Sequence, residues 1–394
     1  MKTHHSLQQV LKQTDWCKLS NTHVSNVFSK LARCRTSHLG YHHYRCNNPD
    51  CSHTHYQYHS CRNRHCPVCN WQKQQAWMEA RLNELLPVKY FHVVFTLPHE
   101  LNAMVMGNRV LLFKLLFDSA AHCLLTLGAD PKWLGATPSI TAVLHTWGQQ
   151  LSFHPHVHCI VSGGGVDEQL NWIELKKKSG QGYLFPYQVM EPLFKKHFLH
   201  QVQKMISQGV LNLTVEQVTQ WPWLKDALYR KKWVVYAKSP MRGAAQVVEY
   251  LARYAHKVAI SNHRILEVTQ ERVLFQYKDY NDNGTTKQMW LSAEEFLRRY
   301  AEHILPRGFV KMRHYGILAN ANRHSRINRI LQKMNLPLHP PAVEVPYQLR
   351  LLERYGIDIE LCPKCKTGRM MLTGVLYPNN RGSPLTSSFS TVLK

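Results

Sequence analysis

The segment that most constrains the fold is HPHVHCIVSGGG, residues 154–165. Its apolar run at 157–161 and the glycines that follow predict a β-strand that stops at the glycines. Because side chains alternate along a strand, His154, His156 and His158 should share one face while the apolar residues enter a core. Two imidazoles at i and i+2 can hold one divalent cation and leave its other side open. A single histidine is usually surface or a hydrogen-bonded core residue, but three on one face favour a metal site.

The segments around this strand predict an antiparallel hairpin and its supporting helix. Residues 140–147 form a second strand signal, joined to the histidine strand by a connection so short that the two should pair antiparallel. Residues 90–97 and 233–237 predict further strands, and 101–127 an apolar core helix that charged side chains interrupt.

Cysteines indicate a zinc site near the N-terminus. The pair Cys66 and Cys69 has the two-residue spacer with which two thiolates chelate one tetrahedral zinc, and Cys46 and Cys51 supply the second half of a four-cysteine structural site. Cys61 and nearby histidines are spare donors, so a different ligand set or a second zinc remains open. Clustering in a chain with no export signal favours metal over disulfides and a reducing compartment, the cytoplasm. The alternative is a set of buried free thiols.

The C-terminal region carries a second knuckle, Cys362-Pro363-Lys364-Cys365, with no other cysteine pair near it in sequence. Two interpretations stay open. Distant residues complete a zinc site, or the two thiols have no ligand role.

The charge of the chain points to a polyanionic partner. Lys and Arg number 49 against 25 Asp and Glu, a formal net charge of +24. Binding of such a protein to a phosphate backbone is favourable because it releases the counterions held there. The alternative, an anionic membrane surface, is less favoured because no segment is apolar enough to span and none resembles a signal peptide. Residues 298–333 hold nine basic residues and one acidic residue, the densest basic stretch.

Two tyrosines stand at helical spacing in YLARY, within a helix predicted over about 244–256. Tyr250 and Tyr254 are four residues apart and therefore share a helix face. Tyrosines at this spacing are usually core aromatics. Beside a metal site in a basic protein, a phenol can instead attack a DNA phosphate, forming a 5′-phosphotyrosine and freeing a 3′-hydroxyl. Since an unperturbed phenol has a pKa of about 10, a metal on the phosphate would have to assist.

The combination of HPHVHCIVSGGG, YLARYAHKVAISNHRI and the earlier CRNRHCPVCN resembles the two-tyrosine HUH transposases of rolling-circle insertion sequences, with their N-terminal zinc-binding domain. The likeness extends from about residue 10 to 330. It implies an α+β fold with a central antiparallel sheet flanked by helices. It also implies that His156 and His158 are the metal-binding pair and that Tyr250 and Tyr254 are the nucleophiles.

The resemblance also implies a third metal ligand of variable position. Gln149, seven residues before His156, is the first choice, His154 the second, and His256 a further candidate. A set of two histidines and an amide implies Mg²⁺ or Mn²⁺ at this site, with Zn²⁺ in the N-terminal domain. The residues alone also leave Zn²⁺ open at the histidine site.

Three regions follow from this interpretation: a helical lead-in and zinc-binding domain at 1–89, a catalytic domain at 90–335, and a tail at 336–394. The expected function is nicking and rejoining of single-stranded or hairpin DNA at element ends and of target DNA, in the bacterial cytoplasm at the nucleoid, with no membrane partner. The alternatives are a plasmid rolling-circle replication initiator or relaxase, and a non-catalytic zinc-dependent DNA-binding protein.

Overall fold

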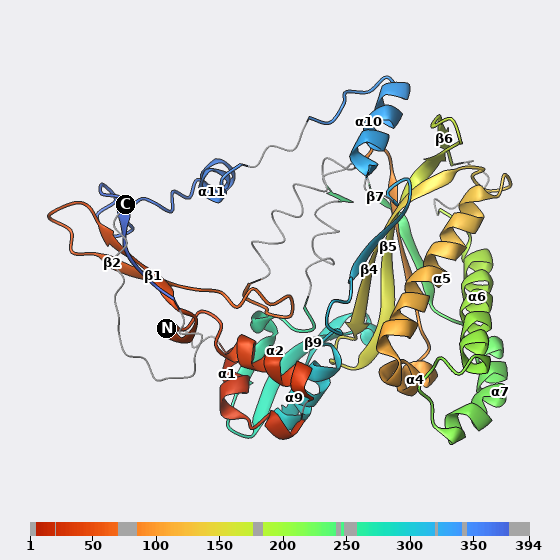
Figure 1. Ribbon diagram of the computed structural model, residues 1–394, viewed down its shortest axis with the longest axis horizontal. Coiled ribbons are helices and arrows are strands. Elements are labelled where there is room, and N and C mark those ends of the chain that lie inside the picture. The colour runs from red at the N-terminus through yellow and green to blue at the C-terminus, as the bar shows by residue number, and fades with distance from the viewer. Residues whose placement is uncertain are drawn as a thin grey trace.

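The computed structural model describes residues 5–19, 21–69, 85–175, 184–241, 246–247, 258–319, 322–340 and 345–377. Within these ranges the chain forms three antiparallel sheets, with helices packed on them (Figure 1). The predicted α+β class with a central antiparallel sheet is confirmed. The helix predicted over 244–256 lies outside the described residues apart from 246–247.

The largest sheet has six strands in the order β11-β4-β5-β3-β7, with the short β6 paired to β5. β5 occupies the middle, between β4 and β3, so the predicted hairpin of the histidine strand with residues 140–147 is confirmed. The strands are β3 (Tyr90–Thr96), β4 (Thr137–Trp147), β5 (Phe153–Val166), β6 (Trp172–Glu174), β7 (Val235–Met241) and β11 (Met312–Gly316).

One face of this sheet is the main hydrophobic core. Val157, Cys159 and Val161 are fully buried there, as the alternation along β5 predicts. They pack against α5 (Arg109–Ala129), whose other side contacts α6 (Tyr187–Ser207). The remaining helices near this face are α4 (Asn102–Gly107) and α7 (Val215–Arg230).

Helix α5 is long and apolar enough to cross a membrane by length and composition, so the expectation that no segment is apolar enough to span is wrong. Twelve of its 21 residues are nevertheless buried against the sheet and the neighbouring helix. A helix that is apolar on most sides fits such a position between two layers of a core. The core helix predicted from the sequence is therefore confirmed.

The histidine strand runs farther than predicted. β5 continues through the glycines at 163–165, so the expectation that they end the strand is wrong. A Cβ on Gly164 would lie 2.4 Å from the ring of Trp172, and one on Gly165 would lie 2.6 Å from the carbonyl oxygen of Thr137. The glycines therefore allow β6 and β4 to approach β5 closely.

A second hydrophobic core joins distant parts of the sequence. The N-terminal helices α1 (Leu7–Gln13) and α2 (Thr22–Ala32) share it with residues 259–304. Residues on both sides of the predicted boundary at 89 therefore belong to one core. The later elements are β8 (Ile265–Val268), β9 (Arg272–Asp279), β10 (Thr285–Ser292) and α9 (Ala293–Glu302).

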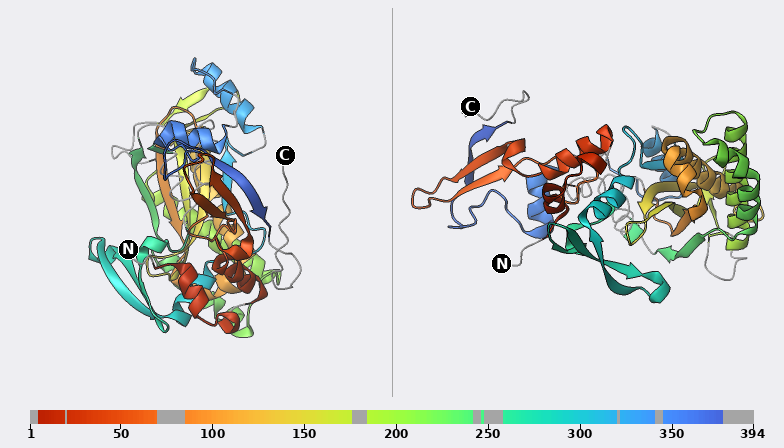
Figure 2. Two further views of the ribbon diagram at one scale, coloured as in Figure 1. Left: turned by 90° about the vertical axis from the view of Figure 1, so that its left-hand side faces the viewer. Right: turned by 90° about the horizontal axis from the view of Figure 1, so that it is seen from below.

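The third sheet pairs the two ends of the chain. Its order is β12-β1-β2, so the C-terminal strand lies beside the N-terminal hairpin at one end of the molecule, away from the central sheet (Figures 1 and 2). The strands are β1 (Tyr41–Cys46), β2 (Thr54–Tyr58) and β12 (Met370–Leu376), and the chain returns to them through α10 (Arg323–Lys333) and α11 (Tyr347–Tyr355). Short 3-10 helices are η1 (Cys17–Leu19), η2 (Ser37–Leu39), η3 (His99–Leu101), η4 (Asn262–Arg264) and η5 (Tyr280–Asp282).

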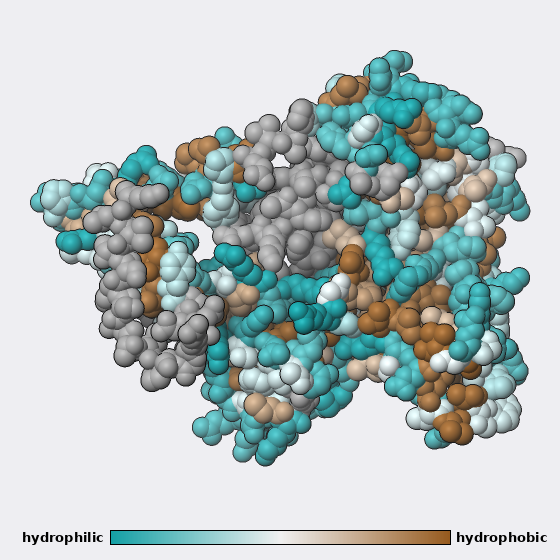
Figure 3. Space-filling view, viewed as in Figure 1, coloured by the Kyte–Doolittle hydropathy of each residue, from teal (hydrophilic) through white to brown (hydrophobic). Residues whose placement is uncertain are grey.

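The face of the molecule drawn in Figure 3 is largely hydrophilic, as the high charge requires. Apolar residues gather where α4, α5 and α7 reach the surface, and Val110, Val215 and Trp223 are among the exposed ones. The face of β5 that carries the histidines is opposite the α5 core; His154 on it is exposed, His156 is half-buried and His158 is buried.

Candidate functional site

Three histidines converge on the face of the central sheet that α5 does not cover. His145 on β4 pairs directly with His156 on β5, and His158 follows two residues later. One ring nitrogen from each lies within 4.8 Å of the others. The ring centroids of His145 and His158 are 4.5 Å apart, and those of His156 and His158 are 4.8 Å apart. We call this group the three-histidine cluster.

Hydrogen bonds orient two of these rings. Histidines that bind metals in proteins are usually held in the same way, through the ring nitrogen that does not face the metal. Nδ1 of His156 lies 2.7 Å from the carbonyl oxygen of His154, so Nδ1–H donates and Nε2 keeps its lone pair. Nδ1 of His158 lies 2.8 Å from Nε2 of the buried His92 on β3. If Nδ1–H of His158 donates to that nitrogen, Nε2 of His158 is also left as a metal donor.

The residues chosen from the sequence as third ligands lie differently. The side-chain amide of Gln149, in the turn between β4 and β5, donates to the hydroxyl of Tyr280 at 3.4 Å. His154 is exposed, and its ring centroid is 5.3 Å from that of His156, but it is not among the three grouped histidines. His256 lies outside the described residues.

His145 is the residue that sequence reasoning missed. It lies in the predicted strand 140–147, and the observed pairing of β4 with β5 places it opposite His156. The β4–β5 register shifts between His145 and Trp147, so counting back from the turn alone misplaces the pair by one residue. The role of His145 therefore depends on which residues face each other across the hairpin, and the periodicity of one strand does not show that.

Basic and aromatic residues surround the three-histidine cluster. The ring of Trp147 stacks on His145 at 4.6 Å, and the ammonium of Lys311 lies 5.4 Å from the centroid of Trp147. Burial, with the charge of Arg64 adding to it, lowers the pKa of Lys311 to about 7. Trp147, Lys311 and Arg64 line a small cavity of about 20 Å³. This surrounding favours an anionic substrate group near the histidines.

A buried histidine fixes the turn that leads into β5. His303 accepts from the Thr146 hydroxyl at 3.3 Å and donates to the carbonyl oxygen of Leu151 at 3.0 Å. Burial lowers the pKa of His303 to about 4, so this ring is neutral near pH 7 and both hydrogen bonds fit one tautomer. His303, at the C-terminal end of α9, therefore adds to the turn's own hydrogen bonds between Gly148 and Ser152 and between Leu151 and Gly148.

The predicted nucleophiles Tyr250 and Tyr254 lie outside the described residues. The chain enters their segment from β7, which pairs with β3 next to β5. It leaves at Val258, which lines the same small cavity as Trp147.

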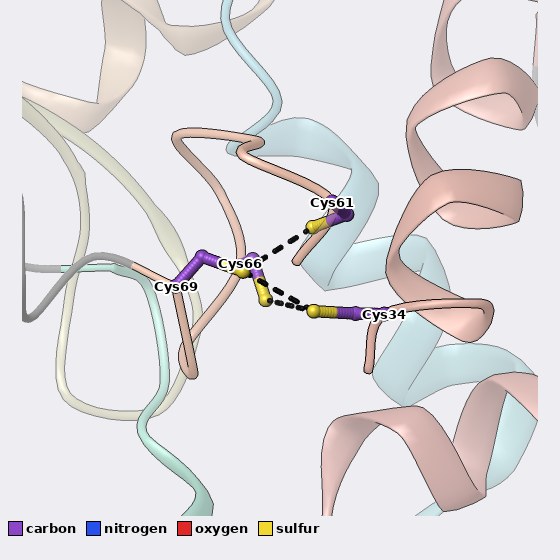
Figure 4. A group of neighbouring side chains, drawn as sticks. All are labelled: Cys34, Cys61, Cys66 and Cys69. Carbon is purple, nitrogen blue, oxygen red and sulfur yellow. Dashed lines mark hydrogen bonds between the residues drawn. The ribbon is translucent and has the colours of Figure 1, made fainter. Parts of the chain in front are cut away.

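The cysteines form two groups of four, one of the arrangements that the sequence left open. Figure 4 shows the first cysteine cluster, Cys34, Cys61, Cys66 and Cys69, in the second core. The Sγ atoms of Cys34 and Cys69 are 3.2 Å apart, and the pairs Cys61–Cys69 and Cys34–Cys66 are each 3.6 Å apart. Hydrogen bonds among these thiols lower the pKa of Cys34 and raise the pKa values of Cys61 and Cys66.

The expectation that Cys46 and Cys51 complete the site of Cys66 and Cys69 is therefore wrong. The hairpin of β1 and β2, which carries Cys46 and Cys51, lies away from the second core. The thiols of Cys46 and Cys51 lie beside those of Cys362 and Cys365 instead. We call Cys46, Cys51, Cys362 and Cys365 the second cysteine cluster. Cys34, which completes the first cluster, was missed because it stands alone in sequence, 27 residues before Cys61.

Comparisons with known proteins agree with this arrangement. Residues 139–326 match the protein family described as "Putative transposase", and residues 3–97 match a family described as "Transposase zinc-binding domain". The chain is 38% identical over 374 residues to "Putative transposase y4qJ" of Sinorhizobium fredii, with 92% of each chain covered. The chain belongs to the two-tyrosine transposases of insertion sequences.

A second relative is the "Transposase for insertion sequence element IS801" of Pseudomonas savastanoi pv. phaseolicola, 28% identical over 352 residues, which cover 88% of this transposase and 83% of the relative. No solved structure matches the chain significantly. The transposase family match contains all of the three-histidine cluster. The zinc-binding match contains the whole first cysteine cluster but only half of the second.

Proposed function

We propose that this transposase nicks and rejoins single-stranded DNA through 5′-phosphotyrosine intermediates, moving its insertion sequence by a rolling-circle mechanism. The observation that carries the proposal is the three-histidine cluster on the sheet face opposite α5, with the rings of His158 and His156 oriented by hydrogen bonds to His92 and to the His154 carbonyl. The DNA would be the single-stranded or hairpin ends of the element and its target, in the bacterial cytoplasm at the nucleoid.

The donor set fits a divalent cation. His145, His156 and His158 would hold it, with the remaining positions open to oxygen atoms of the substrate. Imidazole donors suit Mn²⁺ better than the harder Mg²⁺, so of the two metals expected from the sequence the cluster favours Mn²⁺. A cation bound there would withdraw charge from the scissile phosphate and orient it for in-line displacement.

The chain's own nucleophiles would be Tyr250 and Tyr254. A phenol oxygen attacks phosphorus, the bond from phosphorus to the 3′-oxygen breaks, and the phenol gives up its proton while the released 3′-oxygen gains one. The phosphotyrosine keeps the energy of the phosphodiester, so the reverse attack by a 3′-hydroxyl rejoins DNA without a nucleotide cofactor. Two nucleophiles permit a second cleavage before the first link is resolved.

Connectivity supports this role for the tyrosines. Their segment starts from β7, which is separated from β5 only by β3, and it ends at a residue that lines a cavity with Trp147. The second end of the segment therefore lies at the cavity beside Trp147, whose ring stacks on His145. The first end follows Met241, which pairs with Tyr90 and so lies level with Ser162, four residues beyond His158 on β5. Lys311 and Arg64 line the same small cavity beside Trp147.

The test is a search for the covalent adduct on labelled single-stranded DNA containing an element end, with Mn²⁺ or Mg²⁺. Tyr250→Phe and Tyr254→Phe should each lose transposition, and protein-linked DNA on a denaturing gel should disappear only when both are changed. Tyr229→Phe, a change at a surface tyrosine of α7, is the matched control and should keep the adduct. An adduct that persists in the double variant would contradict the proposal.

A further inference from the structure

The second cysteine cluster has the dimensions of a zinc–tetrathiolate site. The Sγ atoms of Cys46 and Cys365 are 3.7 Å apart, and those of Cys51 and Cys362 are 3.8 Å apart. All four sulfurs lie within 4.8 Å of one another. A tetrahedron with Zn–S bonds of about 2.3 Å has sulfur–sulfur edges of about 3.8 Å. Disulfide bonds would instead require sulfurs about 2 Å apart.

The backbone around these cysteines is shaped to hold thiolates. The amide of Gly368 donates to Cys365 Sγ at 3.3 Å, and the amide of Asn48 donates to Cys46 Sγ at 3.4 Å. Lys366 adopts a left-handed φ of 56°, which lets the chain turn tightly after Cys365. Each pair thus sits in a knuckle whose N–H groups point at sulfur, and such hydrogen bonds stabilise the negative charge of a bound thiolate.

The two knuckles also fit closely against each other. A Cβ on Gly368 would lie 2.5 Å from Cys46 Sγ, so only glycine permits this approach. The amide of Asn47 donates to the Arg369 carbonyl at 3.0 Å, and the Arg369 amide donates to the Asn47 side chain at 2.7 Å. Cys46, Cys51 and Cys362 are buried, which leaves little access for a substrate and is typical of a structural zinc site.

Within the part of the chain that the structure describes, the sheet that carries the cluster has no other substantial hydrophobic core. Every residue of β2 is exposed, and β12 has no buried residue. The buried hydrophobic residues recorded at this place are the cysteines themselves, Cys46, Cys51 and Cys362, with Cys365 and Met370 beside them. A small sheet without a hydrophobic face is marginal in water, and proteins commonly stabilise such units with a metal.

We propose that Cys46, Cys51, Cys362 and Cys365 bind a second structural zinc ion that fastens the C-terminal segment to the N-terminal hairpin. The metal joins residues as far as 319 positions apart and makes β12 a strand of the N-terminal sheet. Residues 362 and 365 lie far beyond the zinc-binding family match, which ends at 97. The proposal does not depend on the chemistry at the three-histidine cluster.

Metal content of the purified full-length chain tests the proposal. The double variant Cys362→Ser, Cys365→Ser should contain one zinc fewer per chain than Cys17→Ser, measured by plasma mass spectrometry. Cys17 is an exposed cysteine outside both clusters, so Cys17→Ser is the matched control. Equal zinc in the two proteins would overturn the proposal.

Cobalt substitution and a conservative variant separate ligation from misfolding. With Co²⁺ in place of Zn²⁺, the double variant should lose about half of the thiolate-to-cobalt absorption, because the first cysteine cluster remains. Cys365→His should keep the second metal, since imidazole can replace a thiolate at zinc, whereas Cys365→Ala should lose it or bind it at least tenfold more weakly. If Cys365→Ala kept the second metal as fully as Cys365→His, Cys365 would not be a ligand.

Discussion

At the scale of single residues, the site depends on side chains that no individual strand reveals. His156 and His158 are two residues apart on β5 and could be paired from the sequence. His145 reaches them from β4, and His92 supports His158 from β3, so three strands contribute to one cluster. His145 and His92 are unremarkable in their own segments, and only strand pairing gives them a role.

His145→Ala tests whether the third donor is this histidine or Gln149. Removing one of three ligands should weaken Mn²⁺ binding by at least about tenfold, roughly 1.4 kcal/mol, and lower the yield of DNA adduct. Titration calorimetry of the metal-free protein with Mn²⁺ measures the affinity directly. Gln149→Ala is the comparison and should change the affinity by less than about twofold. The opposite pattern, with a large loss only for Gln149→Ala, would make Gln149 the ligand.

At the scale of elements, the β4–β5 hairpin is the unit that builds the site. Its apolar face packs on α5, its other face presents the histidines, and His303 holds its turn. Beyond the histidines, the glycines at 163–165 keep β5 in contact with its neighbours β4 and β6. The packing of the apolar residues and glycines of β5 thus fixes where its histidines lie.

Gly165→Ala tests this close approach. The new Cβ would meet the carbonyl oxygen of Thr137 at 2.6 Å, so β4 must shift, and we expect a loss of about 1–3 kcal/mol in the free energy of unfolding. Denaturant unfolding followed by circular dichroism gives the value. Gly374→Ala is the matched control, because a Cβ there meets nothing within 4 Å. Similar stability of the two variants would show that the glycine triplet has no steric role.

At the scale of the whole molecule, later parts of the chain pack against the N-terminal region at two places. The helices α1 and α2 share a core with β8, β9, β10 and α9, although more than 200 residues separate them in sequence. The C-terminal strand β12 likewise joins the N-terminal hairpin. The N-terminal zinc-binding region is therefore fixed to later parts of the chain at two separate places.

Phe28→Ala tests the first of these connections. Phe28 is fully buried, and its ring lies 6.2 Å from that of Tyr300 on α9. Truncation should cost about 3–5 kcal/mol and increase amide hydrogen exchange in β9 as well as in α2, because the two belong to one core. Val215→Ala, at a residue 84% exposed, should leave both unchanged. Faster exchange confined to the N-terminal helices would contradict a shared core.

The sequence by itself determined the features that depend on local periodicity and composition. These are the histidine strand and its hairpin partner, the buried apolar helix, the zinc-binding cysteine knuckles and the basic charge. The charge follows from composition. The strands, the helix and the knuckles follow from spacing within about twenty residues, since side-chain direction repeats every two residues in a strand and every 3.6 in a helix.

Only the tertiary structure decided which of these local features meet. It placed His145 with His156 and His158, assigned Cys34 and Cys61 to Cys66 and Cys69, and brought the C-terminal knuckle to Cys46 and Cys51. The physical reason is that a metal site is defined by donor atoms a few ångströms apart in space. Local spacing identifies chelating pairs, whereas their partners are selected by strand pairing and core packing between segments that may be hundreds of residues apart.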